Sequence, residues 1–180
     1  MHVCIRPWTA TDAPAIVEAL SDAGVTDNLR DGLPQPYTEA DARDYIAYAR
    51  TAGEGAYAFA IDAGGEAAGS IQLTRQGNIH RRTAELGYYV VRRLWGRGVC
   101  TEAVRQICRF AFAETDLLRV YAEPFADNAA SCRVLEKAGF RLEGVMRHSA
   151  VKNGVVRDMR LYSLLREDLE CIGSCRCSGP

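Results

Sequence analysis

Long apolar runs and a large net charge are both missing from this chain of 180 residues. No window approaches the roughly 20 consecutive apolar residues of a membrane-spanning helix, and residues 1–8 contain no apolar signal region. The 22 basic and 23 acidic side chains leave a formal net charge of −1, which gives no support for nucleic-acid binding through bulk electrostatics. We therefore expect a cytoplasmic protein with neither a membrane nor a nucleic acid among its partners.

The cysteine count is seven, an odd number in a chain too long to need stapling by disulfides. Four cysteines fall in or beside apolar segments and are expected to be small buried side chains: Cys4, Cys100, Cys108 and Cys132. The other three, Cys171, Cys175 and Cys177, could hold a metal only with a fourth ligand from elsewhere, so we expect no metal. They belong to residues 169–180, which we expect to be a short flexible tail after a single domain formed by residues 1–168.

The most informative stretch is residues 85–103, where an apolar run ends in a turn rich in glycine and arginine. The run favours a strand because β-branched and aromatic side chains dominate it. The turn reads Arg-Leu-Trp-Gly-Arg-Gly over residues 93–98, and residues 101–114 carry apolar side chains at helical spacing. The free N–H groups and the dipole of a helix start favour an anion, and glycine lets a ligand approach the main chain. We therefore predict an anion site here, in preference to a plain turn with solvated arginines.

Two common phosphate-binding loops are excluded by the residues around these glycines. No Gly-Lys-Ser/Thr follows them, as a Walker loop requires. A dinucleotide fingerprint needs a third small residue where Thr101 stands, and it belongs to a leading strand–helix–strand unit rather than to the middle of a chain. The remaining interpretation is a binding site for a pyrophosphate-containing ligand of another kind.

The order of the expected elements predicts a mixed α/β (α+β) fold. It comprises a largely antiparallel sheet of about seven strands with one parallel pair at its centre, and about four helices. Residues 83–91 and 117–123 are expected to form the parallel pair through a right-handed crossover. Residues 24–36 are expected to be irregular, because Gly32, Pro34 and Pro36 forbid a long helix. Strand and helix do not alternate throughout, which excludes a doubly wound sheet.

Two motifs in this chain resemble those of one family. Arg93-x-x-Gly96-x-Gly98, followed by Thr-Glu-Ala, resembles the acyl-CoA-binding motif of the GNAT N-acetyltransferase superfamily. Residues 128–144 resemble its second motif, with Asn-x-x-Ser, Glu-Lys-x-Gly-Phe and Glu-Gly in that order. The second pattern is most similar to the branch that contains the Rim-type ribosomal-protein N-terminal (alanine/serine) acetyltransferases. The resemblance covers about residues 3–167 and implies the GNAT fold, with its central parallel strands splayed apart, and acetyl-CoA as cosubstrate.

The resemblance also implies which residues bind acetyl-CoA. Main-chain groups of Val90 and Val91 would bind the amide arm of the pantetheine. The pyrophosphate would rest on main-chain amides of the following turn, to which arginine side chains can add charge: Arg93, Gly96, Arg97, Gly98, Val99, Cys100 and Thr101. Asn128 has two interpretations, a helix cap, for which asparagine is well suited, or a hydrogen-bond partner of the pantetheine. Both can hold at once.

Direct acetyl transfer to an amine needs a base for the amine and a proton for the departing thiolate, but no covalent enzyme intermediate. The resemblance implies that the Ser131 hydroxyl stabilises the thiolate; a serine merely tolerated in a first helical turn is the alternative. Some Rim-type members carry a glutamate, implied as their general base, at the place of Ala150. In this chain another group must therefore act as the general base. We expect Glu85 first, with His148 and Asp158 as alternative side chains and a water chain to solvent as a further route.

The expected acceptor is a primary amine, either the N-terminal amine of a (ribosomal) protein or a small-molecule amine. The resemblance implies that residues 22–37 cover this acceptor. A catalytically silent CoA-binding regulatory module is the alternative from another class, and a nucleotide-binding protein is a third. A homodimer is one of the assemblies that the sequence allows.

Overall fold

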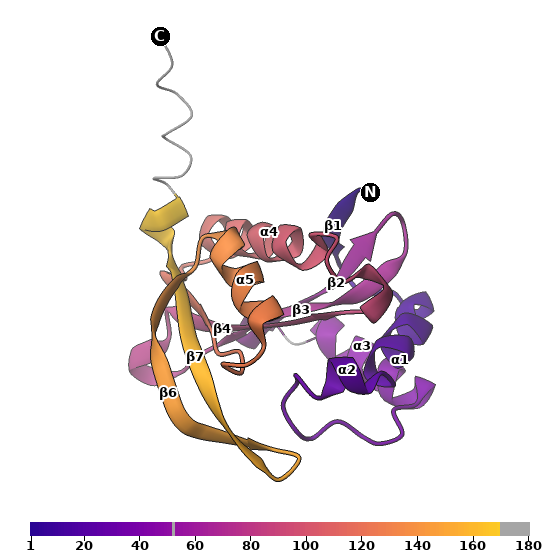
Figure 1. Ribbon diagram of the computed structural model, residues 1–180. Coiled ribbons are helices and arrows are strands. Elements are labelled where there is room, and N and C mark those ends of the chain that lie inside the picture. The colour runs from indigo at the N-terminus through magenta and orange to yellow at the C-terminus, as the bar shows by residue number, and fades with distance from the viewer. Residues whose placement is uncertain (52, 170–180) are drawn as a thin grey trace.

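The computed structural model describes residues 1–51 and 53–169, in which seven strands form one mixed sheet (Figure 1). The sheet order is β1-β2-β3-β4-β5-β7-β6, and every neighbouring pair is antiparallel except β4 and β5. The strands are β1 Val3–Arg6, β2 Ala56–Ala63, β3 Ala67–Arg75, β4 Thr83–Val90, β5 Arg119–Ala122, β6 Arg141–Lys152 and β7 Val155–Leu165. The predicted fold class, with a parallel pair inside a largely antiparallel sheet, is confirmed.

Helices cover both faces of the sheet (Figure 1). Helices α4 and α5 lie on one face, and α1 and α3 lie on the other with the short α2 beside them. The bounds are α1 Ala13–Leu20, α2 Ala23–Thr26, α3 Glu39–Thr51, α4 Val99–Glu114 and α5 Ala129–Ala138. Helix α2 falls in the segment expected to be irregular, where the Asp22 side chain accepts a hydrogen bond from the Gly24 N–H at 2.8 Å and caps a single turn.

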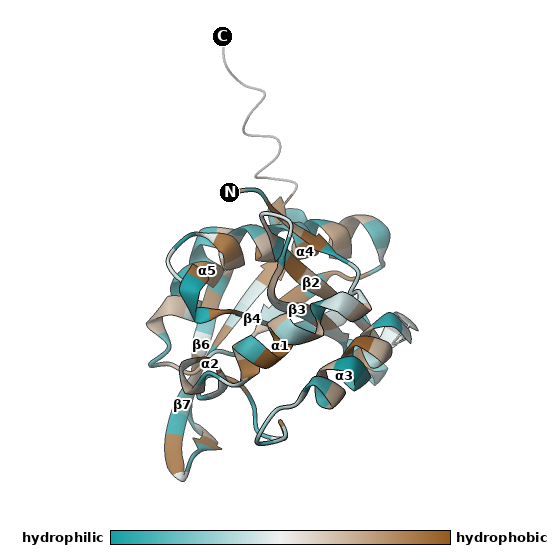
Figure 2. Cartoon of the chain, turned by 90° about the vertical axis from the view of Figure 1, so that its right-hand side faces the viewer, coloured by the Kyte–Doolittle hydropathy of each residue, from teal (hydrophilic) through white to brown (hydrophobic). Residues whose placement is uncertain are grey.

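Two apolar clusters hold these layers together. On one face α4 contributes a stripe that includes Val104, Ile107 and Ala111, all fully buried against the sheet. On the other face Ile16 of α1 packs with Ile46 of α3, and apolar residues of α1 lie beside β3 (Figure 2). This spacing of apolar residues along α4 is the helical period that the sequence shows. Within residues 1–51 and 53–169, none of the helices combines the length and the apolarity that a bilayer crossing requires.

The parallel pair separates towards its carboxyl end. Strand β4 pairs with β5 only from Thr83 to Glu85, opposite Arg119 to Tyr121. Strand β4 then continues to Val90, and among residues 1–51 and 53–169 it pairs there only with β3. The expected splay of the central strands is confirmed, and it leaves one edge of β4 open beside the start of α5.

The α4 stripe should dominate the stability of the fold. We expect Ile107→Ala to lower the free energy of unfolding by about 2–5 kcal/mol, because it leaves a cavity where the wild-type side chain is fully buried. Urea denaturation followed by circular dichroism measures the change. Ile79→Ala is the matched control, since Ile79 is 79% exposed. An Ile107→Ala loss as small as that of the control would contradict the packing described above.

Candidate active site

The turn between β4 and α4 is shaped by two glycines with positive φ. Gly96 has φ +73° and Gly98, the residue before α4, has φ +80°, a conformation that glycine adopts without strain. The first main-chain bond of α4 runs from the Glu102 N–H to the Gly98 carbonyl at 3.1 Å. The N–H groups of residues 99–101 precede that bond and have no partner inside the helix, and glycine has no side chain to cap them. Free N–H groups at a helix start form an anion site, as the sequence predicts.

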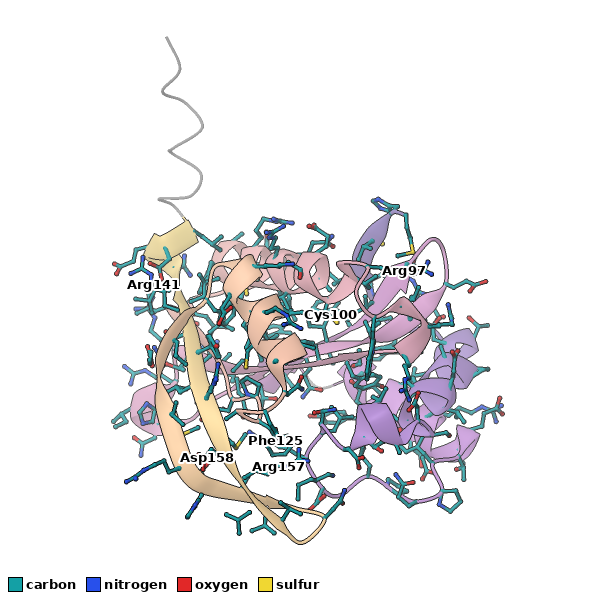
Figure 3. All side chains as sticks on the ribbon, in the orientation of Figure 1. Arg97, Cys100, Phe125, Arg141, Arg157 and Asp158 are labelled. Atoms are coloured by element: carbon teal, nitrogen blue, oxygen red, sulfur yellow. The ribbon has the colours of Figure 1, made fainter. Side chains whose placement is uncertain are left out.

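The arginines of this turn do not all face that anion site. The Arg93 guanidinium donates to Glu18 of α1 at 3.0 Å. Arg92 lies 3.6 Å from Asp22 and over the ring of Trp95. Arg97, labelled in Figure 3, has no carboxylate partner within the part of the chain that the structure describes. The turn is thus tied to α1 and α2 through two of its arginines.

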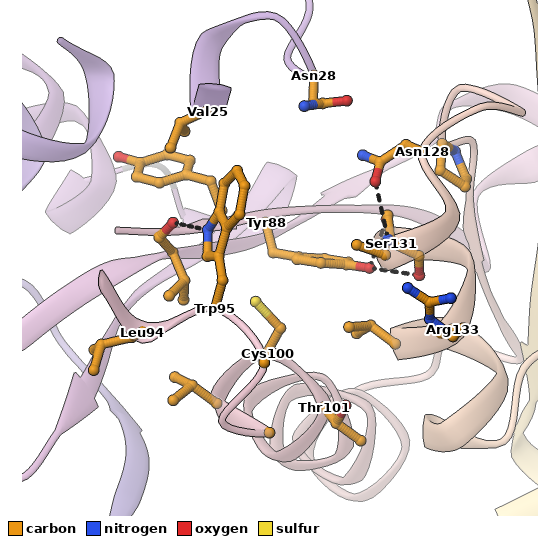
Figure 4. A pocket seen from close by; sticks show the side chains of 18 of the residues that line it. Val25, Asn28, Tyr88, Leu94, Trp95, Cys100, Thr101, Asn128, Ser131 and Arg133 are labelled. Atoms are coloured by element: carbon orange, nitrogen blue, oxygen red, sulfur yellow. Dashed lines mark hydrogen bonds between the residues drawn. The ribbon is translucent and has the colours of Figure 1, made fainter. Parts of the chain in front are cut away.

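A pocket of about 330 Å³ opens beside the start of α4, and we term it the α4–α5 pocket (Figure 4). It lies between the end of β4, the turn, α2 and the first turns of α4 and α5. Eight of the predicted cofactor-binding residues line it: Val90, Gly96, Gly98, Val99, Cys100, Thr101, Asn128 and Ser131. Three others, Val91, Arg93 and Arg97, are not among its lining residues.

The main-chain groups of Val91 are already hydrogen-bonded within the protein. Its side chain is buried, its N–H donates to the Ala68 carbonyl at 2.8 Å, and its carbonyl accepts from the Leu94 N–H at 3.0 Å. The neighbouring Val90 lines the pocket, although its carbonyl accepts from the Trp95 indole N–H at 2.9 Å. The prediction for the pantetheine arm therefore moves from Val91 to the open edge of β4 up to Val90.

The first turn of α5 brings three polar side chains together in this pocket. The Asn128 Oδ1 accepts from the Ser131 N–H at 3.1 Å, which confirms the helix-cap interpretation. The Ser131 Oγ lies 2.8 Å from the Tyr88 hydroxyl, and that hydroxyl also donates to the Ser131 carbonyl at 3.3 Å (Figure 4). Burial raises the pKa of Tyr88, so its hydroxyl keeps its proton. Sequence reasoning treated Tyr88 only as a strand residue and missed this contact.

A second pocket, of about 410 Å³, lies against β3 and β4, and we term it the β3–β4 pocket. It is lined by β3, β4, the chain after α2, and tyrosines that include Tyr37 and Tyr45. The two pockets share the lining residues Leu29, Tyr88 and Tyr89. The two pockets therefore adjoin at these three residues.

Glu85 lines the β3–β4 pocket and is the first of the predicted bases. Its carboxylate contacts the guanidinium of Arg30, which also lies 3.7 Å from Glu123. Burial raises the pKa of Glu85, Arg30 opposes the rise, and the charge of Glu123 adds to it. A carboxylate with a raised pKa inside a pocket is suited to accept a proton.

The other two predicted bases lie elsewhere. His148 is exposed and has φ +51°, at a register irregularity of β6. Its main-chain N–H donates to the Asp158 carboxylate at 2.8 Å. Asp158 lies on the long β6–β7 hairpin (Figure 3). Neither residue lines either pocket, so the geometry favours Glu85 over both.

Metal ligands were not expected, and residues 1–51 and 53–169 contain no group of three or more His, Cys, Asp or Glu placed to hold a metal. The expectations about Cys171, Cys175 and Cys177 lie outside the described residues.

Residues 2–141 match the family described as the acetyltransferase (GNAT) domain. The chain belongs to the GNAT acetyltransferase family. The family resemblance of the two sequence motifs is thereby confirmed.

Individual GNAT relatives agree with this assignment. YjcK of Bacillus subtilis, named a probable N-acetyltransferase, is 42% identical over 89 residues, which are 49% of each protein. YdaF of the same organism, provisionally named a ribosomal N-acetyltransferase, is 35% identical over 106 residues, 59% of this chain and 57% of YdaF. The chain spans about half the length of these curated relatives. A GNAT acetyltransferase structure from Bacillus anthracis superimposes with a TM-score of 0.79 at 25% identity, covering 93% of this chain and 96% of that one.

The α4–α5 pocket fits the acetyl-CoA that the GNAT resemblance implies. The free N–H groups of residues 99–101 suit the diphosphate, and the open edge of β4 suits the amide arm. A Cβ added at Gly98 would meet no atom within 4 Å, so the main chain is open to a ligand there.

We expect Gly98→Glu to abolish CoA binding, because a side chain and a negative charge enter the predicted diphosphate site together. Isothermal titration calorimetry with CoA measures the loss. Gly154→Glu is the matched control: Gly154 has φ +75°, is exposed in the turn between β6 and β7, and has equally open surroundings. It should carry the same backbone strain and bind CoA normally. Unchanged affinity in Gly98→Glu would show that the diphosphate binds elsewhere.

Proposed function

We propose that this chain transfers the acetyl group of acetyl-CoA to a primary amine by direct attack. The observation that carries the proposal is that the two pockets adjoin at Leu29, Tyr88 and Tyr89. A thioester held in the α4–α5 pocket would present its carbonyl to an amine held in the β3–β4 pocket. No covalent enzyme intermediate is needed, and burial raises the pKa of Cys100 in the α4–α5 pocket to about 12, which disfavours a nucleophilic thiolate.

Main-chain groups would hold the donor. The N–H groups of residues 99–101 would bind the diphosphate, and the open edge of β4 near Val90 would bind the pantetheine. The Asn128 side chain caps α5 through its oxygen, which leaves its NH₂ group as a donor facing the same pocket. Acetyl-CoA itself supplies an activated acyl group.

Glu85 would act as the general base. A primary amine is largely protonated at neutral pH and must lose a proton before it attacks. Strand alternation directs Glu85, Gly87 and Tyr89 to one face of β4, towards the β3–β4 pocket. Because the pKa of Glu85 is raised, its carboxylate is a stronger base than an exposed glutamate.

Ser131 would stabilise the departing thiolate by donating a hydrogen bond to it, and the proton that ends on sulfur would come from the attacking amine. Its hydroxyl is held by the Tyr88 hydroxyl at 2.8 Å, which fixes its direction and connects it to a second protonated group. Tyr88 therefore positions Ser131, although it was not among the predicted site residues.

The acceptor we propose is the N-terminal amine of a protein. The similarity to YdaF and the Rim-type pattern of residues 128–144 support this choice. A small-molecule amine is the rival acceptor. A second candidate function, a catalytically silent CoA-binding module, is favoured by one departure from the Rim-type pattern, since Ala150 stands where some members carry a glutamate.

Release of free CoA thiol distinguishes these functions. The enzyme is incubated with acetyl-CoA and, separately, with peptides beginning in alanine or serine, the same peptides with acetylated N-termini, an amino acid and a polyamine. We expect thiol release with the free peptides and none with their acetylated forms. Turnover only with the polyamine or the amino acid would establish the rival acceptor. CoA binding without turnover on any amine would establish the silent module.

The Glu85→Gln variant belongs in the same assay. We expect kcat to fall by about 10²–10⁴-fold, the usual contribution of a general base. The raised pKa of Glu85 means that the active carboxylate is lost as pH falls through that raised value, so the acid limb of the wild-type profile should lie above the ordinary range of glutamate. Glu66→Gln, in the exposed turn between β2 and β3, is the matched control and should behave as wild type. A Glu85→Gln enzyme with normal kcat and an unchanged acid limb would exclude Glu85 as the base.

A further inference from the structure

Arg30 reaches the proposed base from a segment far away in the sequence. Its guanidinium contacts Glu85, 55 residues further along the chain, and lies 3.7 Å from Glu123. Arg30 lines the β3–β4 pocket, yet its side chain is 68% exposed. An ion pair this exposed contributes little to folding stability. Its main effect is therefore on the β3–β4 pocket, where the guanidinium occupies part of the space beside Glu85.

The segment that carries Arg30 is held on both sides. The Lys152 ammonium, in a residue only 8% exposed, donates to Asp31 at 2.7 Å. Asn153 donates to Asp27 at 2.9 Å. Both contacts come from the end of the β6–β7 hairpin, which lies beside this segment in Figure 1. The residues on both sides of Arg30 are therefore tied to the β6–β7 hairpin, whereas the Arg30 side chain itself pairs with two glutamates.

The charges leave room for one organic cation. Glu85 and Glu123 share the single charge of Arg30, while Asp31 is neutralised by Lys152. A primary ammonium that gives its proton to Glu85 would compete with the guanidinium for that carboxylate. Unlike an ammonium, a guanidinium stays protonated at any working pH and so cannot become a nucleophile.

We propose that Arg30 is an inert internal stand-in for the acceptor's ammonium group, and that an acceptor must displace it from Glu85. This inference rests on the proposed acetyl transfer. Arg30 thereby determines specificity: it competes with every acceptor, and it selects those whose cation is compact enough to take its place between Glu85 and Glu123. A side chain at this position with a removable proton would itself be the acceptor.

The Arg30→Lys variant tests this directly. The introduced amine should form an N–C bond to the acetyl carbon as the C–S bond breaks and its electron pair leaves on sulfur. Of the two protons lost by the ammonium, one would leave through Glu85 to solvent and the other would end on the thiol. We expect incubation with acetyl-CoA to add one acetyl group at position 30, detected by peptide mass spectrometry.

Arg43→Lys is the matched control, because Arg43 also pairs with a glutamate, Glu39 at 2.8 Å, but on the exposed face of α3. The side chain introduced at position 43 should stay unmodified. If Arg30→Lys is not acetylated while the wild-type enzyme acetylates free amines, this inference is overturned and the proposed function stands. If the wild type acetylates no amine in the panel, the proposed function itself fails.

Arg30→Ala gives an independent readout. We expect the KM for the amine to fall by about three- to tenfold with a smaller change in kcat, because a competing internal cation has been removed. Added guanidinium chloride at non-denaturing concentration should raise the KM again in this variant. A higher KM in Arg30→Ala would show that Arg30 helps to bind the acceptor, and would overturn the inference.

Discussion

Unpaired main-chain groups at the end of β4 and the start of α4 are the constraint on which the rest of the site depends. Glycine at position 98 turns the chain into α4 with φ +80° and provides no side-chain cap, so the first N–H groups of the helix remain free. The separation of β5 from β4 after Glu85 leaves the adjoining strand edge open as well. Such groups would destabilise an ordinary protein interior, and here they lie beside a pocket, where we propose that bound CoA satisfies them.

A single strand serves both reaction partners because its side chains alternate. Tyr88 contacts Ser131 of α5, Glu85 lines the β3–β4 pocket, and Tyr88 and Tyr89 line both pockets. The open edge between them joins the two sides. We propose on this geometry an acetyl transfer in which neither substrate becomes attached to the protein, with the base Glu85 on β4 and Ser131 on α5.

The sequence predicted the parts of this arrangement that depend on local pattern. The glycine turn, the parallel pair, the α5 cap at Asn128 and the strand that carries Glu85 all follow from short-range spacing and turn chemistry. The missed features are contacts between distant segments: Arg30 with Glu85 across 55 residues, and Tyr88 with Ser131 across 43. His148 is predicted as an alternative base, but only the tertiary structure shows that it lies on the hairpin and lines neither pocket.

The most direct measurement is a crystal structure of the protein with CoA. The prediction is that the diphosphate oxygens lie within hydrogen-bonding distance, about 3 Å, of the N–H groups of residues 99–101, and that the sulfur lies beside the Ser131 hydroxyl near Tyr88, where the two pockets adjoin. A diphosphate bound away from the start of α4, or a sulfur that points away from the β3–β4 pocket, would contradict it.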